Sequence, residues 1–139
     1  MAYSSTNNST DNFRIKLYTG NESARTITYD ESTNMKPDLV WVKSRGHTAS
    51  WLANDSIRGA TKRLKIDANS AESEQTSMIS AFATNGFTLG TSTTANQNST
   101  TFGSWSWLAG GTFVFYSSTS PREFVRCGIG SCGCNIGGG

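Results

Sequence analysis

The residue types that most often carry catalysis are sparse in this 139-residue chain. His47 is the only histidine, and Gly46 before it indicates a turn. Nucleophilic catalysis needs a base beside a serine, cysteine or similar group, and no recognisable nucleophile motif surrounds His47. Acidic residues cluster in predicted loops at 30–31 and 72–74, whereas a glycosidase needs two carboxylates facing each other across ~5–9.5 Å. We therefore predict no catalytic residue and a non-enzymatic protein.

The cysteines are the only candidates for a metal site. Cys127, Cys132 and Cys134 give the spacing C-x4-C-x-C near the C-terminus. Structural zinc sites favour four ligands in C-x2–4-C pairs, and an odd, terminal set is not a disulfide framework. The prediction is free thiols, with no metal and no cofactor, and the pattern assigns the cysteines no role.

Basic residues give a candidate contact surface. Lys43 and Arg45 follow an apolar run, and further basic side chains occur at Arg58, Lys62, Arg63 and Lys65. Such charges are ordinarily solvated surface, but they would also suit an acidic neighbouring subunit or an anionic cell-surface polymer. The net charge of +2 is too small to indicate nucleic-acid binding. Asp55 is expected to fix its loop through a structural ion pair, with Arg58 or with Arg45.

Tryptophan side chains could stack on the faces of sugar rings, with amides and hydroxyls fixing the sugar's orientation. Trp105 and Trp107 are two positions apart, so a strand places both rings on one face, and we predict that this face is core. Trp51 lies beside a turn, where core and binding roles are equally open. The candidate residues for glycan or subunit contact are Lys43, Arg45, Trp51 and Arg58.

These residues surround one central strand, Asp38–Arg45, which reads DLVWVKSR. Its apolar run is too short for a typical helix and is rich in β-branched and aromatic residues, which predicts a strand covered on both faces. Pro37 suits a strand start, because its missing N–H is tolerated there. Gly46 and the segment 50–53 predict a hairpin partner for this strand.

Other alternating runs predict further short strands. Phe13, Ile15 and Leu17 alternate with Arg14, Lys16 and Tyr18 in a half-buried strand. Asn85-Gly86 between two apolar runs is a strong hairpin signal, because both residues accept positive φ. Short strands with frequent turns predict an all-β fold, an antiparallel β-sandwich of jelly-roll or concanavalin-like type. We expect its core at 39–42, 78–82, 87–89 and 105–108.

The domain organisation follows from composition. Residues 1–12 are polar and predict a flexible N-terminal arm, residues 13–116 predict the β-sandwich, and residues 117–139 predict a Gly/Cys-rich tail. The arm lacks the layout of a signal peptide, so we expect synthesis and folding in a cytoplasm. No apolar run approaches the ~20 residues of a membrane helix, and we expect no membrane insertion.

Four ordered motifs carry a resemblance. PDLVWVKSR (37–45), DSIRGATKRL (55–64), SAFATNGFTLG (80–90) and SWSWLAGG (104–111) resemble a module common in tailed phages, especially marine ones. The resemblance covers 13–111, and the chain beyond Gly111 departs from the β-rich continuation of many relatives. It implies a protein of a tail fibre or another virion surface, located on the virion after synthesis in the host.

The expected function combines these observations. We expect a non-enzymatic structural protein of a phage virion (decoration, fibre or tail appendage) that acts through self-assembly. Its expected partners are further copies of itself and other virion proteins, because symmetric assembly is how small subunits build large surfaces. One alternative is a carbohydrate-binding module that attaches the particle to a host-surface glycan. Another is an extracellular filament subunit, for which exposed strand edges would serve.

Overall fold

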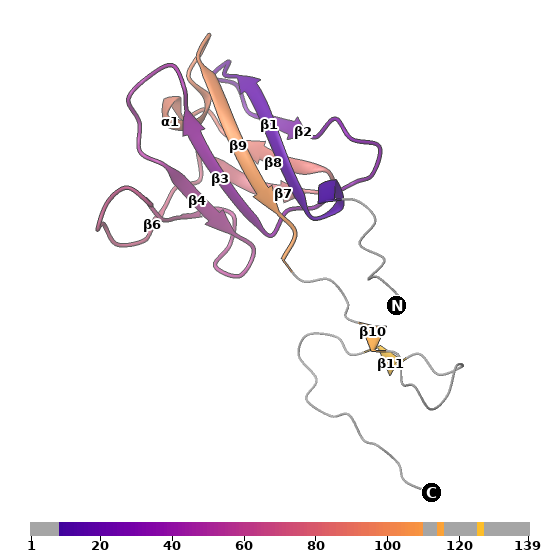
Figure 1. Ribbon diagram of the computed structural model, residues 1–139. Helices are drawn as coiled ribbons and strands as arrows, with labels where there is room; N and C mark the ends of the chain where they lie inside the picture. The colour runs from indigo at the N-terminus through magenta and orange to yellow at the C-terminus, as the bar shows by residue number, and fades with distance from the viewer. Residues whose placement is uncertain (1–8, 110–113, 116–124, 127–139) are drawn as a thin grey trace, which may run out of the picture. The chain divides into compact units, whose positions relative to one another are not determined.

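The predicted central strand is β3 (Leu39–Ser44), which lies between two partners in an antiparallel sheet. Residues 9–109, 114–115 and 125–126 are described by the computed structural model. β3 pairs with β9 (Thr101–Trp107) on one side and with β4 (Leu52–Asp55) on the other. The outer strand β1 (Phe13–Thr19) pairs with β9, so the strand order is β1-β9-β3-β4 (Figure 1).

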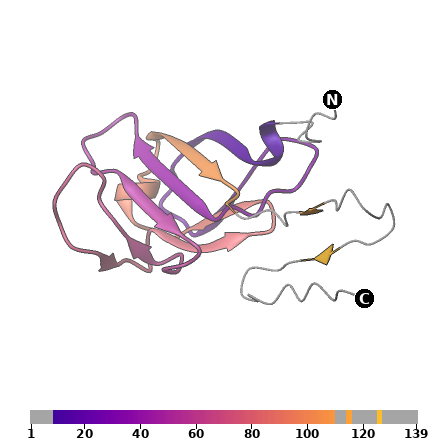
Figure 2. The ribbon, with the colours of Figure 1, turned by 60° about the horizontal axis from the view of Figure 1, so that its bottom comes forward.

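A second antiparallel sheet covers one face of the first. Its order is β2-β8-β7, formed by β2 (Arg25–Thr28), β8 (Gly86–Leu89) and β7 (Ile79–Ala83). The predicted hairpin at Asn85-Gly86 joins β7 to β8, and Gly86 has a φ of 129°. In Figure 1 this sheet lies behind the larger one, and the turned view in Figure 2 shows the two layers more nearly edge-on.

A small hairpin continues the larger sheet beyond β4. It pairs β5 (Lys62–Arg63) with β6 (Ser73–Glu74). Ala53 and Leu64 exchange two backbone hydrogen bonds of 3.0 Å, which attach this hairpin to β4. Because cross-strand partners share a face, Leu64 lies on the same face as Ala53.

The core fills the space between the two sheets. Alternation along each strand turns Val40 and Val42 of β3, and Phe102 of β9, toward the second sheet, where their side chains are fully buried. Ile79, Phe87 and Leu89 meet them from the other layer. The chain is thus an all-β antiparallel sandwich, as predicted, while the jelly-roll or concanavalin-like assignment stays a prediction.

The faces of β1 are the reverse of what an alternating apolar pattern suggests. Arg14 is 1% exposed and Tyr18 is buried, whereas Ile15 is 54% and Leu17 58% exposed. The inner side of β1 therefore carries the arginine and the tyrosine. The expectation that Trp105 and Trp107 belong to the core is also wrong. Both are half-buried on the outer face, because Phe102, Ser104 and Ser106 take the inner positions of β9.

Several ordered segments lie in predicted loops or ends. The one-turn helix α1 (Thr93–Asn96) follows its N-cap Ser92 and buries Ala95 and Asn96. The 3-10 helix η1 (Ser9–Asp11) falls within the predicted arm of residues 1–12, whose first eight residues lie outside the described range. The side chains of Met35 and Pro37 are buried in the segment that leads from β2 to β3.

The chain divides into two compact units, Met1–Ala109 and Gly110–Gly139. The first unit contains the whole sandwich, and the predicted domain boundaries at residues 12 and 116 stay predictions. In the second unit, β10 (Val114–Phe115) pairs antiparallel with β11 (Val125–Arg126). The three cysteines lie outside the described residues. Among the helices that are described, none has the length and apolar character needed to cross a membrane.

Candidate interaction face

All four tryptophans of the chain gather on the outer face of the larger sheet. The ring centroid of Trp107 lies 5.0 Å from that of Trp41 and 5.1 Å from that of Phe13. Trp51 continues the series, 6.4 Å from Trp41 and 5.4 Å from Trp105. The rings thus form one connected group across β1, β9, β3 and the start of β4.

Exposed aliphatic side chains extend this group at both ends. Ile15 and Leu17 lie beside it on β1, and Leu64, which is 38% exposed, lies on the same face beyond β4. Gly103 leaves room for an aromatic ring, because a Cβ there would lie 3.1 Å from the Trp105 indole. We name this surface the tryptophan face and define it as Phe13, Ile15, Leu17, Leu39, Trp41, Trp51, Leu64, Trp105 and Trp107. A contiguous apolar surface of this kind is the usual mark of an interaction site.

Of the four predicted contact residues, Trp51 belongs to the tryptophan face and Lys43 lies on the same side of the sheet. The backbone N–H of Trp51 donates to Asp67 Oδ2 over 3.3 Å. Lys43 is half-buried on the same face of β3, and its ammonium donates to the carbonyl oxygen of Ala49. Lys43 therefore closes the loop that follows β3. Arg45 is exposed at the end of that strand.

The fourth predicted residue, Arg58, forms a charged group beside the tryptophan face. Its Nε donates to Asp55 Oδ2 over 2.6 Å, and its Nη1 donates to Glu72 Oε2 over 2.9 Å. Asp55 Oδ1 also accepts the backbone N–H of Arg58 over 2.8 Å. Asp55 is paired with Arg58, and Arg45 takes no part. This arrangement fixes the turn after β4 to the β5–β6 hairpin.

The Asp55–Arg58 pair gives a pH prediction. Partial burial alone raises the pKa of Asp55, but the hydrogen bonds from Arg58 and its charge outweigh that effect, so the pKa is net lowered. A lowered pKa stabilises the fold above the unfolded value and loses that stability as pH falls through the folded value. We expect Asp55→Asn to cost about 1 kcal/mol at pH 7 and much less at pH 3, measured by urea unfolding. Glu72→Gln is the milder control, and an equal cost at both pH values would contradict the pairing.

The lone histidine is a structural residue of the turn after β3. Ser44 Oγ lies 2.7 Å from His47 Nδ1 and accepts the His47 backbone N–H over 3.1 Å. Ser44 is buried on the inner face, and the His47 ring packs edge-on against Phe102 at 5.8 Å. A hydroxyl acting as a nucleophile must reach a substrate, so this serine–histidine contact serves the local turn.

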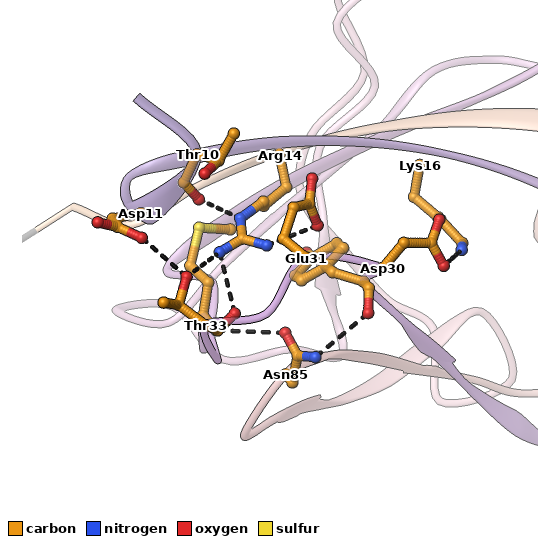
Figure 3. Close-up of polar contacts among 10 residues, drawn as sticks. Thr10, Asp11, Arg14, Lys16, Asp30, Glu31, Thr33 and Asn85 are labelled. Carbon is orange, nitrogen blue, oxygen red and sulfur yellow. Dashed lines mark hydrogen bonds and ion pairs between the residues drawn. The ribbon is translucent and has the colours of Figure 1, made fainter. Parts of the chain in front are cut away.

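A second polar cluster lies at the end of the sandwich where β1 begins (Figure 3). Buried Arg14 donates from Nη1 to Glu31 Oε2 over 2.5 Å, and from Nη2 to the Thr33 carbonyl over 3.0 Å and its hydroxyl over 2.8 Å. Its Nε donates to the carbonyl of Thr10. The Tyr29 ring lies 6.0 Å from its Cζ. Arg14 therefore ties β1, η1 and the loop after β2 together.

Asn85 completes this connection from the second sheet. Its Oδ1 accepts the Met35 N–H and its Nδ2 donates to the Tyr29 carbonyl, both over 3.3 Å. The loop from Tyr29 to Met35 is therefore held by Arg14 from one layer and Asn85 from the other, as Figure 3 shows. Burial is also the main reason that the pKa of Tyr29 is raised, to about 12. The cluster is a structural clamp, because the side chains of Arg14 and Asn85 bond to groups within the fold.

Sequence reasoning identified part of this surface and missed the rest. Trp51 was named as a contact residue, but Trp41 was assigned to the core, and Ile15 and Leu17 were assigned to a half-buried strand. The missing signal was on β9, where serines at 104 and 106 alternate with the tryptophans. Small hydroxyl side chains fit a tightly packed interior, which leaves the large rings for the outer face. In the described part of the chain, no three metal-ligating side chains converge.

Comparisons with known proteins give one family. A family model described as a domain of unknown function, DUF7483, matches residues 8–121. No curated protein and no solved structure matches the chain. The matched range contains both sheets of the sandwich and every residue of the tryptophan face. The chain therefore belongs to the DUF7483 family.

Proposed function

We propose that this chain is a non-enzymatic structural subunit of a phage virion, and that it acts through subunit contacts on the tryptophan face. One observation carries the proposal: all four tryptophans and several exposed aliphatic side chains share one face of the larger sheet. Exposed apolar surface of this kind is costly in water and is retained where a partner covers it. Tryptophan is also the residue type most enriched among interface hot spots.

The chemistry of the face favours a protein partner over a sugar. Sugar sites combine aromatic rings with convergent hydrogen-bonding groups, whereas the neighbours of the rings here include Ile15, Leu17 and Leu64. The charged side chains around the rings are engaged within the fold: Lys43 donates to Ala49, Arg58 donates to Asp55 and Glu72, and Asp67 accepts the Trp51 N–H. A central apolar area with satisfied polar groups at its rim is the usual anatomy of a protein interface.

The virion context rests on the resemblance of four motifs to a module of tailed phages. Three of those motifs contribute to the tryptophan face. PDLVWVKSR contributes Leu39 and Trp41, DSIRGATKRL contributes Leu64, and SWSWLAGG contributes Trp105 and Trp107. The resemblance implies a virion-surface chain, and a face that binds other subunits would suit such a chain.

A carbohydrate-binding module is the second candidate. The favouring observation is the tilted pair Trp51 and Trp105, whose planes differ by 41° at 5.4 Å. Such a pair could receive the face of one sugar ring. The glycan would be one of the host surface, and the tryptophan face would then be a platform for the polymer.

Replacing Trp105 with alanine tests the proposed face. We expect binding of the chain to purified virion proteins to weaken at least about tenfold, because a hot-spot residue contributes ~2 kcal/mol or more. The measurement is sedimentation of the purified chain with density-purified particle components, after circular dichroism has shown a folded variant. Ile57→Ala is the matched control, since Ile57 is apolar and 94% exposed outside the tryptophan face.

Two results would contradict this proposal. Absence of the chain from density-purified particles, examined by peptide mass spectrometry, would reject the virion role. Binding of Trp105→Ala at wild-type strength would reject the tryptophan face. Co-sedimentation of the wild-type chain with insoluble host polysaccharide, lost in Trp51→Ala, would instead establish the carbohydrate-binding candidate.

A further inference from the structure

Among the described residues, none pairs with the outer edge of β1 in the larger sheet. β1 is the first strand in the order β1-β9-β3-β4, and in the described range its ladder partner is β9 alone. At the opposite side, the reciprocal bonds between Ala53 and Leu64 attach the β5–β6 hairpin to β4. The ion pair Lys62–Glu74, at 3.0 Å, closes that hairpin. The β4 edge of the sheet is thus covered by a hairpin, whereas the β1 edge has no such cover among the described residues.

The register determines which backbone groups of β1 face outward. Leu108 N–H donates to the Asn12 carbonyl over 2.9 Å, and Gly20 N–H donates to the Thr100 carbonyl over 2.8 Å. In an antiparallel ladder, bonded and non-bonded positions alternate. Even-numbered residues of β1 therefore bond to β9, and the N–H and C=O groups of Phe13, Ile15, Leu17 and Thr19 point away from it. Of these, the Thr19 carbonyl accepts a bond from Arg25.

The side chains along this edge do not obstruct another strand. Proteins commonly protect an edge with a lysine or a proline, or with a charge that a new strand would bury. Here Arg14 and Lys16 point to the inner side, where Glu31 and Asp30 already pair with them. Ile15 and Leu17 lie on the outer side and are more than half exposed. The outer side of this edge is therefore apolar, and on its inner side the charges of Arg14 and Lys16 are paired with carboxylates.

We propose that this edge binds the same edge of a second copy, so that two β1 strands pair antiparallel and the larger sheets join across a two-fold axis. A second copy supplies a strand of the same length with the same outward groups, so each N–H meets a C=O. It also places Ile15 and Leu17 of one copy against those of the other, which removes apolar surface from water. The pairing rests on the proposed subunit role and names the partner: another molecule of this chain.

The test compares three substitutions to lysine in the full-length chain. Reducing conditions prevent the cysteines from linking copies. Leu17→Lys places a lysine at the open edge, as natural sheet proteins do to block pairing. Leu64→Lys places the same charge at the opposite end of the tryptophan face, separated from β1 by β9, β3 and β4. Ile57→Lys places it at an exposed site outside the face. Sedimentation velocity over a range of concentrations measures dimer formation.

We expect a wild-type dimer whose dissociation constant rises at least tenfold in Leu17→Lys and is unchanged in Ile57→Lys and Leu64→Lys. Hydrogen exchange gives an independent readout. The amides of Ile15 and Leu17 point outward and exchange slowly only in the dimer, whereas those of Lys16 and Tyr18 bond to β9 and stay slow in the monomer. This contrast separates edge pairing from a general change in stability.

Two results would overturn edge pairing. A dimer that is lost in Leu64→Lys but kept in Leu17→Lys would mean that the tryptophan faces stack, which leaves the proposed function intact. A chain that stays monomeric at every concentration, with rapid exchange at Ile15 and Leu17, would reject pairing of copies. The proposed virion role would then be judged separately, by the composition of purified particles.

Discussion

Replacing Gly86 with alanine is expected to cost roughly 3–5 kcal/mol of unfolding free energy, from backbone strain together with steric overlap. Gly86 has a φ of 129°, in the region that residues with a Cβ rarely adopt. A Cβ there would lie 1.9 Å from the carbonyl oxygen of Ile27 on β2, against which β8 pairs. The backbone of β2 cannot withdraw without breaking the ladder. Urea unfolding, followed by tryptophan fluorescence, measures the loss.

Gly59→Ala is the matched control for this substitution. Gly59 has a φ of 106°, but a Cβ there would have no other atom within 4 Å. We expect it to cost about 1–2 kcal/mol, from backbone strain alone. The difference between the two variants isolates the close approach of β8 to β2. Equal losses in both would show that this approach contributes nothing.

The second large effect is expected at Arg14, where alanine should remove roughly 3 kcal/mol. The substitution removes the guanidinium that donates to the carbonyl groups of Thr10 and Thr33 and opens a space beneath the Tyr29 ring. Glu31 keeps partial access to water, so its carboxylate is solvated after the loss. The cost therefore comes mainly from these lost hydrogen bonds and from the lost packing of the buried arginine.

Glu31→Gln separates the charge from the packing at this cluster. Burial by itself raises the pKa of Glu31, but the hydrogen bond and the charge of Arg14 lower it further than burial raises it. The glutamine variant keeps the shape and loses the charge, and we expect a loss well below that of Arg14→Ala at pH 7. If both variants unfold at the same urea concentration, the ion pair with Glu31, and not the hydrogen bonds to Thr10 and Thr33, holds the clamp.

The strands of this fold were predictable where one local signal was decisive. Asn85-Gly86 specified a hairpin because its turn type needs a positive φ, and the structure places that φ at Gly86. The run 39–42 indicated a strand because its apolar, β-branched side chains suit a sheet, and β3 is indeed central in the larger sheet. The expectation that both of its faces are covered is wrong, since only alternate residues of β3 are buried. Neither inference required knowledge of distant segments.

The facing of β1 could not be obtained locally. A half-buried strand ordinarily turns its aliphatic side chains inward, which would bury Ile15 and Leu17. Arg14 takes the inner position because Glu31 and Thr33, more than fifteen positions away, supply acceptors there. A buried arginine is stable only with such partners, and a single strand does not reveal them. Reversing one strand moves its aliphatic side chains to the opposite surface.

The candidate surface was recognisable only in fragments for the same reason. Trp51 was named from its position beside a turn, and Lys43 and Arg58 were named as basic residues. The structure brings Trp51 together with the other tryptophans, while the two charged residues bind within their loops. Trp105 and Trp107 share a face in any strand, but alternation alone does not tell which face. The face that carries the two tryptophans is set by the alternating serines of β9, which pack against the second sheet.

The sandwich begins and ends at one place, since Phe13 lies opposite Trp107 and Leu108 donates to Asn12. A domain whose first and last strands are neighbours can be placed inside a loop of another protein with little distortion of its host. Its ends can also be joined by a short linker and reopened elsewhere, as in a circular permutant. The same arrangement delays folding during synthesis, because β1 must wait for a strand some ninety residues later before it gains its partner.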